Sequence, residues 1–554
     1  MTVTDTARPR PLGVVGRAVD MLTSHVRVSL AAIVAGQVTL TVALFLTVEH
    51  NGWLTYQGGD QIWLLTSGWL LGQGTIPYAL VGWGWPLVVA PLTWVAGASS
   101  IQMLPLTHAL QVLVLGPIAT LCVYDIATRI AGRAAGLWAS TAFVVTPVVV
   151  TPLFVDRYRE LWTDQVLVQF YGLTQLADFP STVLVLAAAA LTLRSLDEGA
   201  YREAALAGAL AGFAAGVKPA NYLFLAGPVL AYLVARRWRQ GALFAAMLAP
   251  ATLTLIVWKD RGLGTIPAFG AGAVHVAASH TASLPLGEGF FDRFPLHLDD
   301  WNRNMSNLRE FFWSARLAQW APLAGALAVA RRSLPASALL LGWLLGYVVV
   351  KGSSNVAGIE NGSFWRLVMP ALPAYLLLVV AIPLLVPTVA RRLGSRIAPP
   401  PPRRPSRRGV VAVVAALAIV PLGAMLASSP QSGPGQAIDV DDILVPVDEG
   451  VVQLRVERVG DSQRLTWADA TTRTTTFYRV YRTEGSGPDV DCATAGGDRC
   501  DLRMTLLATT RARTYLDASP EAGVTYRVGV AANWLDDPER GDVFVISPPV
   551  PAAP

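Results

Sequence analysis

The sequence predicts an all-α polytopic membrane domain of about eleven transmembrane helices, followed by a C-terminal all-β sandwich. Of its 554 residues, 53% are hydrophobic and only 15% are charged, whereas soluble proteins average about 25% charged residues. Several apolar runs match the roughly 20 residues that cross a bilayer as a helix. After residue 428 the sequence becomes more polar, and polar and apolar residues alternate with the two-residue period of a β-strand.

Arginine clusters between the apolar runs set the expected orientation in the membrane. Such loops face the cytoplasm under the positive-inside rule, so the net charge of +5 implies no nucleic-acid partner. The first run follows an arginine-bearing leader and lacks a cleavage site, which predicts a retained anchor. The expected spans are 29–48, 104–127, 135–153, 180–195, 201–217, 220–236, 240–258, 314–330, 334–350, 364–388 and 409–428. The N-terminus is therefore expected in the cytoplasm and the C-terminus outside the plasma membrane.

Four parts are expected along the chain. They are a cytoplasmic segment at 1–28, a membrane domain at 29–428, a linker at 429–445 and an extracytoplasmic sandwich at 446–554. Long outer loops are expected at 49–103, 154–179 and 259–313, and they contain most of the acidic residues of the first 428 positions. Because loops carry binding and catalytic residues more often than buried elements do, we expect the chemistry on the outer face.

Alternating polar and apolar residues predict the strands of the C-terminal sandwich. The runs are 451–458, 463–468, 476–482, 504–509, 524–532 and 542–547. About seven short strands in about 100 residues are typical of a β-sandwich. The strings Leu465-Thr-Trp, Tyr478-Arg-Val-Tyr-Arg and Gly523-Val-Thr-Tyr-Arg-Val resemble the core-tryptophan strand, the next strand and the tyrosine-corner strand of a fibronectin type III domain.

The chain has three cysteines, too few for a thiolate metal site or a redox motif. Cys122 lies inside an apolar run, whereas Cys492 and Cys500 lie in the polar tail. Because the tail is expected outside the cell, where disulfides persist, we predict one disulfide between Cys492 and Cys500.

Short polar motifs separate the apolar runs on the expected outer side. The first loop contains Tyr56-Gln-Gly-Gly-Asp60-Gln, then Pro77-Tyr78, then Gly-Trp83-Gly-Trp85-Pro. The later motifs are Ala177-Asp178-Phe-Pro, Gly216-Val-Lys218-Pro and Phe364-Trp-Arg366. In this order and placement, the motifs resemble those of the GT-C superfamily of polyprenyl-phosphate-dependent glycosyltransferases, such as protein O-mannosyltransferases and lipid A aminoarabinose transferases.

The resemblance implies transfer of a sugar from a polyprenyl-phosphate donor to an envelope glycan, lipid or protein acceptor, with inversion at the anomeric carbon. Such a reaction needs a carboxylate that takes the acceptor's proton and cations that stabilise the departing phosphate. The resemblance implies that Asp60 is the general base and Asp178 a second acidic site residue. It also implies that Lys218 and Arg366 bind the donor phosphate. The candidate substrate-loop residues are Tyr56, Tyr78, Trp83, Trp85 and Glu360.

Several of these residues also have a purely structural interpretation. Asp60 and Asp178 stand where helices are expected to begin, so either carboxylate could cap a helix. Lys259 and Lys351, two of the three lysines, are interpreted as snorkelling at the outer edge of the membrane. Gln61 stands where members of the superfamily often carry a second acidic residue, so we predict no obligatory metal ion and no other cofactor.

A transporter or lipid flippase with an extracytoplasmic binding domain is the alternative function. It predicts inverted repeats and charged residues near the middle of the membrane, and the sequence has neither. A non-catalytic scaffold that displays the sandwich is a third interpretation, which the polar first loop disfavours.

Overall fold

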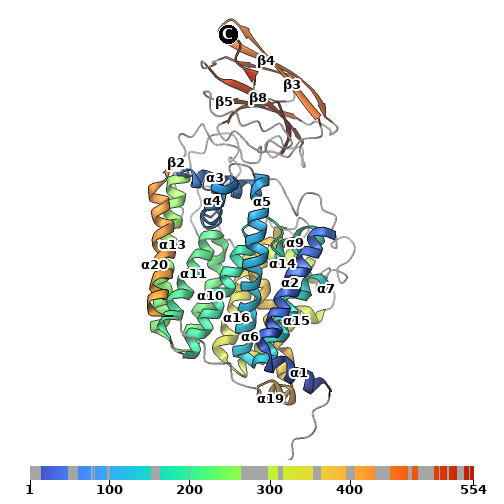
Figure 1. Cartoon of the computed structure of the whole chain (residues 1–554), viewed down its shortest axis with the longest axis vertical. Helices are drawn as coiled ribbons and strands as arrows, with labels where there is room; N and C mark the ends of the chain where they lie inside the picture. The colour runs from blue at the N-terminus through green and yellow to red at the C-terminus, as the bar shows by residue number, and fades with distance from the viewer. Residues whose placement is uncertain are drawn as a thin grey trace, which may run out of the picture.

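A computed structural model of the chain describes a helical bundle and, beyond its α3 end, a group of β-strands near the C-terminus (Figure 1). The described residues are 14–47, 60–76, 79, 82–96, 100–150, 162–198, 200–263, 297–309, 316–353, 363–394, 406–430, 450–471, 477–483, 504–510, 512–518, 520, 523–532, 542–547 and 550–554.

The long helices of the bundle run back and forth along one axis, and α3 lies across their end (Figure 1). The α-helices are α1 (Val14–Ser24), α2 (Val26–Thr47), α3 (Asp60–Gly72), α4 (Gly84–Ala96), α5 (Ser100–Ala109), α6 (Gly116–Ala131), α7 (Arg133–Val150), α9 (Val168–Phe170), α10 (Asp178–Glu198), α11 (Tyr201–Val217), α12 (Ala226–Val234), α13 (Trp238–Leu263), α14 (Leu298–Asn307), α15 (Arg316–Ala330), α16 (Leu334–Gly352), α17 (Ser363–Val368), α18 (Leu372–Ala381), α19 (Pro387–Gly394) and α20 (Arg407–Ala427). Short π and 3-10 segments join or extend them at η1 (Leu110–Leu115), η3 (Trp162–Leu167), η4 (Pro219–Leu225), η7 (Met369–Ala371) and η8 (Ile382–Leu385).

Within the described residues, 8 helices are long and apolar enough to cross a membrane. They are Val26–Leu46, Pro105–Ala131, Arg133–Val150, Asp178–Asp197, Trp238–Lys259, Leu334–Gly352, Phe364–Leu385 and Arg407–Ala427. Shorter apolar helices lie at Gly84–Ala96, Pro219–Val234 and Ala318–Ala330. Every predicted span overlaps helical segments of the described residues, so the prediction of a multi-pass helical membrane protein is confirmed. The number of crossings stays a prediction.

Helix α11 is packed between α10 and α13. Its inward positions are small, and Ala204, Ala207 and Ala214 have no exposed surface. Small side chains allow helix backbones to approach closely, which is the usual way helices associate in a membrane. The C-terminal end of α11 is therefore held firmly between its two neighbours.

The C-terminal region forms two antiparallel sheets, which confirms the predicted β-structure there. The strands are β3 (Gly450–Val459), β4 (Ser462–Thr471), β5 (Phe477–Thr483), β6 (Met504–Thr510), β7 (Thr514–Asp517), β8 (Thr525–Ala532), β9 (Asp542–Ile546) and β10 (Val550–Pro551). One sheet has the order β3-β4-β7, and the other has the order β10-β8-β5-β6 with β9 paired to β8. Trp467, Tyr478 and Tyr526 belong to the shared core. The resemblance to fibronectin type III stays a prediction, and Cys492 and Cys500 lie outside the described residues.

A short parallel strand pair ties the end of the last span to the first loop. In this pair β1 (Thr75–Ile76) aligns with β2 (Ser429–Pro430). The Arg261 guanidinium at the end of α13 donates to the Met425 carbonyl at 2.6 Å and to the Leu426 carbonyl at 2.9 Å. The chain thus leaves α20 on the side of the bundle where α3 lies.

Reporter fusions test the predicted topology. Arg236 and Arg237 lie in the turn between α12 and α13, and Arg239 lies in the first turn of α13, so this turn is expected in the cytoplasm. A reporter that is active only in the cytoplasm should give signal when fused after residue 240 and none when fused after residue 280 or 554. Reporter activity after residue 554 would require an even number of crossings and would place the β-domain in the cytoplasm.

The Tyr526 side chain is predicted to stabilise the β-domain through a buried hydrogen bond. Tyr526 is fully buried, and its hydroxyl donates to Asp517 Oδ2 at 2.8 Å, while Arg482 Nη1 lies 3.5 Å from the same oxygen. Tyr526→Phe removes one donor to a charged acceptor, so we expect a loss of about 1.5 kcal/mol in the free energy of unfolding. This loss is measured by comparing the hydrogen exchange of β8 peptides in the full-length wild type and the Tyr526→Phe variant.

The same contact predicts a dependence on pH. Burial and the hydrogen bond to the Asp517 carboxylate raise the pKa of Tyr526 above its usual value. The protonated phenol is therefore favoured in the folded state, and its contribution is constant below about pH 10 and is lost as the pH rises through the folded pKa. The protection of β8 amides from hydrogen exchange should fall as the pH rises through the folded pKa of Tyr526 in the wild type. It should fall less in Tyr526→Phe. An equal fall in both proteins would contradict this assignment.

Candidate functional site

Three of the predicted site residues, far apart in the sequence, form one group that we call the ion cluster: Asp178, Lys218 and Arg366. Asp178 is the first residue of α10, Lys218 follows the end of α11, and Arg366 lies in α17. Lys218 Nζ forms an ion pair with Asp178 Oδ1, and Arg366 Nε lies 3.7 Å from Asp178 Oδ2. Lys218 Nζ also donates to the Arg366 carbonyl at 3.1 Å. Both carboxylate oxygens of Asp178 therefore face cations.

The carboxylate and the two cations differ in their access to solvent. The Asp178 side chain is 3% exposed, whereas those of Lys218 and Arg366 are 16% and 28% exposed. A buried carboxylate is stable only when cations or hydrogen bonds compensate its charge. The accessible part of the ion cluster is consequently its positive part, which suits an anionic ligand.

The local sequence explains why Lys218 projects between two helices. Pro219 follows it, and a residue before proline is pushed out of the helical region. Lys218 indeed has an extended backbone with φ −140° and ψ 107°, and η4 starts at Pro219. Its N–H still donates to the Ala214 carbonyl at 2.9 Å, so the break begins immediately after the last turn of α11.

The start of α3 is attached to the segment that leads to Asp178. Gln61 is buried, and its Oε1 accepts a hydrogen bond from the Gln175 N–H at 2.7 Å. Trp85 Nε1 donates to the Gln175 carbonyl at 3.2 Å. Gln61 thus attaches the start of α3 to the segment before Asp178. Asp60 is the first residue of α3, but its side chain lies outside the described residues, so its role stays a prediction.

The loop before α4 is packed tightly onto the end of α11. Trp83 is fully buried and makes an edge-to-face contact with Phe213 at a centroid distance of 5.1 Å. A Cβ added to Gly216 would lie 2.3 Å from the Trp83 ring, and one added to Gly82 would lie 2.2 Å from the Gly216 carbonyl oxygen. Only glycine permits this approach. The first loop is therefore fixed beside Lys218, a role that sequence reasoning did not assign to these glycines.

The remaining candidates are placed as follows. Trp83, in the loop before α4, and Trp85, in the first turn of α4, are both buried. Tyr56, Tyr78 and Glu360 lie outside the described residues. In the described part of the chain, no three His, Cys, Asp or Glu side chains are grouped so that they could hold a metal ion, and metal dependence stays a prediction.

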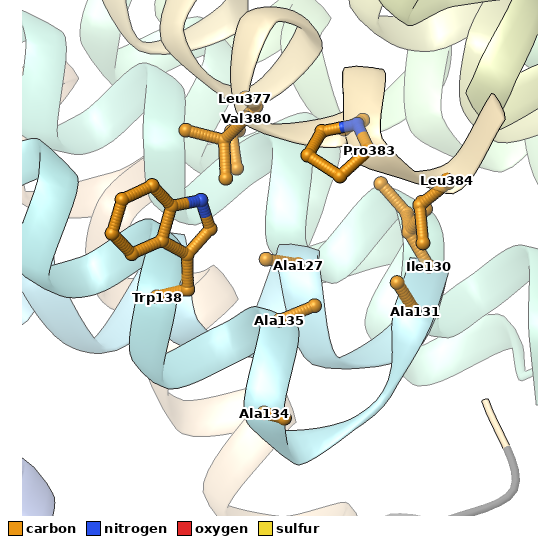
Figure 2. A pocket seen from close by; sticks show the side chains of 11 residues that line it. Ala127, Ile130, Ala131, Ala134, Ala135, Trp138, Leu377, Val380, Pro383 and Leu384 are labelled. Carbon is orange, nitrogen blue, oxygen red and sulfur yellow. The ribbon is translucent and has the colours of Figure 1, made fainter. Parts of the chain in front are cut away.

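Figure 2 shows an apolar pocket of about 110 Å³ beside the turn between α6 and α7. Trp138, Pro383 and Leu384 line it together with alanines at the turn between α6 and α7. Leu384 belongs to the end of the span Phe364–Leu385 that is farthest from Arg366. The pocket's lining contains no charged side chain, so it offers nothing for group transfer.

Comparison with known proteins gives weak likeness only. The chain matches no family model and has no significant match among curated proteins. Among solved structures it is similar to the archaeal oligosaccharyltransferase AglB from Archaeoglobus fulgidus in complex with an inhibitory peptide and a dolichol-phosphate, with 14% identity and a TM-score of 0.39. The apo form of the Archaeoglobus fulgidus oligosaccharyltransferase gives 14% identity and a TM-score of 0.35. Each match covers 74% of this chain and 57% of the other, so this chain matches little more than half of their length. TM-scores this low do not establish a common fold.

Proposed function

We propose that this chain is a membrane glycosyltransferase of the GT-C superfamily that transfers a sugar from a polyprenyl-phosphate donor to an envelope glycan, lipid or protein. The observation that supports the proposal most is the ion cluster, in which two partly accessible cations flank the buried Asp178 carboxylate. The start of α3 is hydrogen-bonded to Gln175, three residues before Asp178. The reaction takes place on the outer face of the plasma membrane, with the N-terminus in the cytoplasm and the β-domain outside.

The proposed chemistry assigns one role to each charged residue. Lys218 and Arg366 bind the donor phosphate through charge-assisted hydrogen bonds, and Asp178 keeps their side chains in position. As the bond between the anomeric carbon and the phosphate oxygen breaks, its electrons pass to the phosphate, whose added charge the cations stabilise. Asp60 takes the proton from the acceptor hydroxyl, which attacks from the opposite side and inverts the anomeric carbon. No obligatory metal ion takes part.

The alternative is a flippase, which moves a lipid-linked sugar across the bilayer without cleaving it. Carriers of this kind bind their substrate near the middle of the membrane. In the described residues, the Asp178 cluster and the pair formed by Asp125 and Arg194 both lie toward helix ends. This placement favours the transferase.

An assay with purified full chain in proteoliposomes tests the proposal. A radiolabelled polyprenyl-phosphate sugar is added together with extracts of envelope acceptors. We expect saturable binding of the donor and release of free polyprenyl phosphate as the label passes to the acceptor. Movement of the intact donor to the other leaflet with no cleavage would instead identify a flippase, and absence of donor binding would refute both.

A further inference from the structure

Helix α16 and segment η4 pack against each other in an antiparallel register that leads to the ion cluster. Trp343 of α16 makes an edge-to-face contact with Phe224 of η4 at a centroid distance of 5.4 Å. One turn further along α16, the Tyr347 hydroxyl donates to Asn221 Oδ1 at 2.6 Å. Trp343 and Tyr347 are fully buried, so the register is well defined.

Continuing this register places Lys351 opposite Lys218. Lys351 follows Tyr347 by four residues, so the two residues share one face of α16. Lys218 precedes Asn221 by three residues, and the Asn221 N–H donates to the Lys218 carbonyl at 2.9 Å. Helix α16 also packs against α17, which carries Arg366.

The register thus brings Lys351 toward Lys218, whose ammonium group is paired with the Asp178 carboxylate, at the edge of the membrane. Charged side chains in such places are costly and usually mark binding sites for a substrate or ion. An anionic ligand between the two lysines is attracted by both ammonium groups. Snorkelling, which the sequence suggests for Lys351, does not explain why the side chain stands opposite Lys218.

We infer that Lys351 is a further phosphate-binding residue, which together with Lys218 binds the phosphate of the lipid-linked donor. The inference rests on the proposed function, because that function supplies the phosphate. It adds a residue from α16 to a site otherwise built from α10, α11 and α17.

Binding of polyprenyl monophosphate to the purified full chain tests the role of Lys351. Lys351→Met should weaken binding by about tenfold to hundredfold, the usual range for loss of a charge-assisted contact. Lys351→Arg retains the charge and should bind nearly as well as the wild type. Arg331→Gln is the matched control, because it removes one positive charge at the opposite end of α16. It should leave binding unchanged.

Lysine labelling provides a second readout that does not depend on a variant. With acetic anhydride, polyprenyl monophosphate should protect Lys351 and Lys218, whereas polyprenol and inorganic phosphate at the same concentration should not. Lys259 is buried and donates to the Ala79 carbonyl, so it serves as an internal reference with or without ligand. This inference alone would be overturned if the wild type binds the lipid phosphate, Lys351→Met binds it equally well, and the lipid does not protect Lys351 from acetylation. Wild-type protein that does not bind it would overturn the proposed function as well.

Discussion

Asp60→Asn is expected to lower turnover by about 10²–10⁴-fold while the affinity for the donor stays at the wild-type level. Asparagine has nearly the shape of aspartate and can still start a helix, so α3 should keep its place. It cannot take a proton from the acceptor hydroxyl. The loss should therefore appear in transfer and not in donor binding.

The measurement follows binding and transfer of one radiolabelled polyprenyl-phosphate sugar, because comparing the two separates the chemical step from substrate affinity. Gln61→Asn is a useful control. It shortens the neighbouring side chain that accepts from the Gln175 N–H, so it should lower stability without removing the proposed base. Full transfer activity in Asp60→Asn would eliminate Asp60 as the general base.

Lys218→Met is expected to lower both the stability of the chain and the affinity for the donor. Without Lys218, Asp178 keeps only Arg366 at 3.7 Å as a cationic partner in the cluster. Removing one partner of a buried ion pair leaves an uncompensated charge, for which we expect about 3 kcal/mol of destabilisation. The missing ammonium group should also weaken donor binding by at least about tenfold.

The double variant Lys218→Met/Asp178→Asn separates these two effects. Because it removes the buried carboxylate as well, it should recover much of the thermal stability lost in Lys218→Met. Donor binding should stay weak, since the phosphate ligand is still absent. Thermal unfolding and donor binding of the four proteins of the cycle measure this. Recovery of donor binding together with stability would mean that Lys218 serves only as the structural partner of Asp178.

Local sequence was sufficient to predict the apolar helices and six strands of the C-terminal region, but not α14, β7 or β10. The thickness of the bilayer sets the length of an apolar span, so runs such as 334–350 predict helices directly, and α16 occupies Leu334–Gly352. Strand alternation in 451–458 likewise predicts β3 at Gly450–Val459. Proline after Lys218 predicts the break between two helices for an equally local reason.

Only the tertiary structure decided which of the candidate residues meet. Asp178, Lys218 and Arg366 come from three segments that helix packing brings together, and no local pattern encodes that packing. The pairing of Gln61 with the Gln175 N–H is equally invisible in the sequence. Lys351, which looks like an ordinary edge lysine in the sequence, stands opposite Lys218 because the register between α16 and η4 is set by the fit of buried side chains.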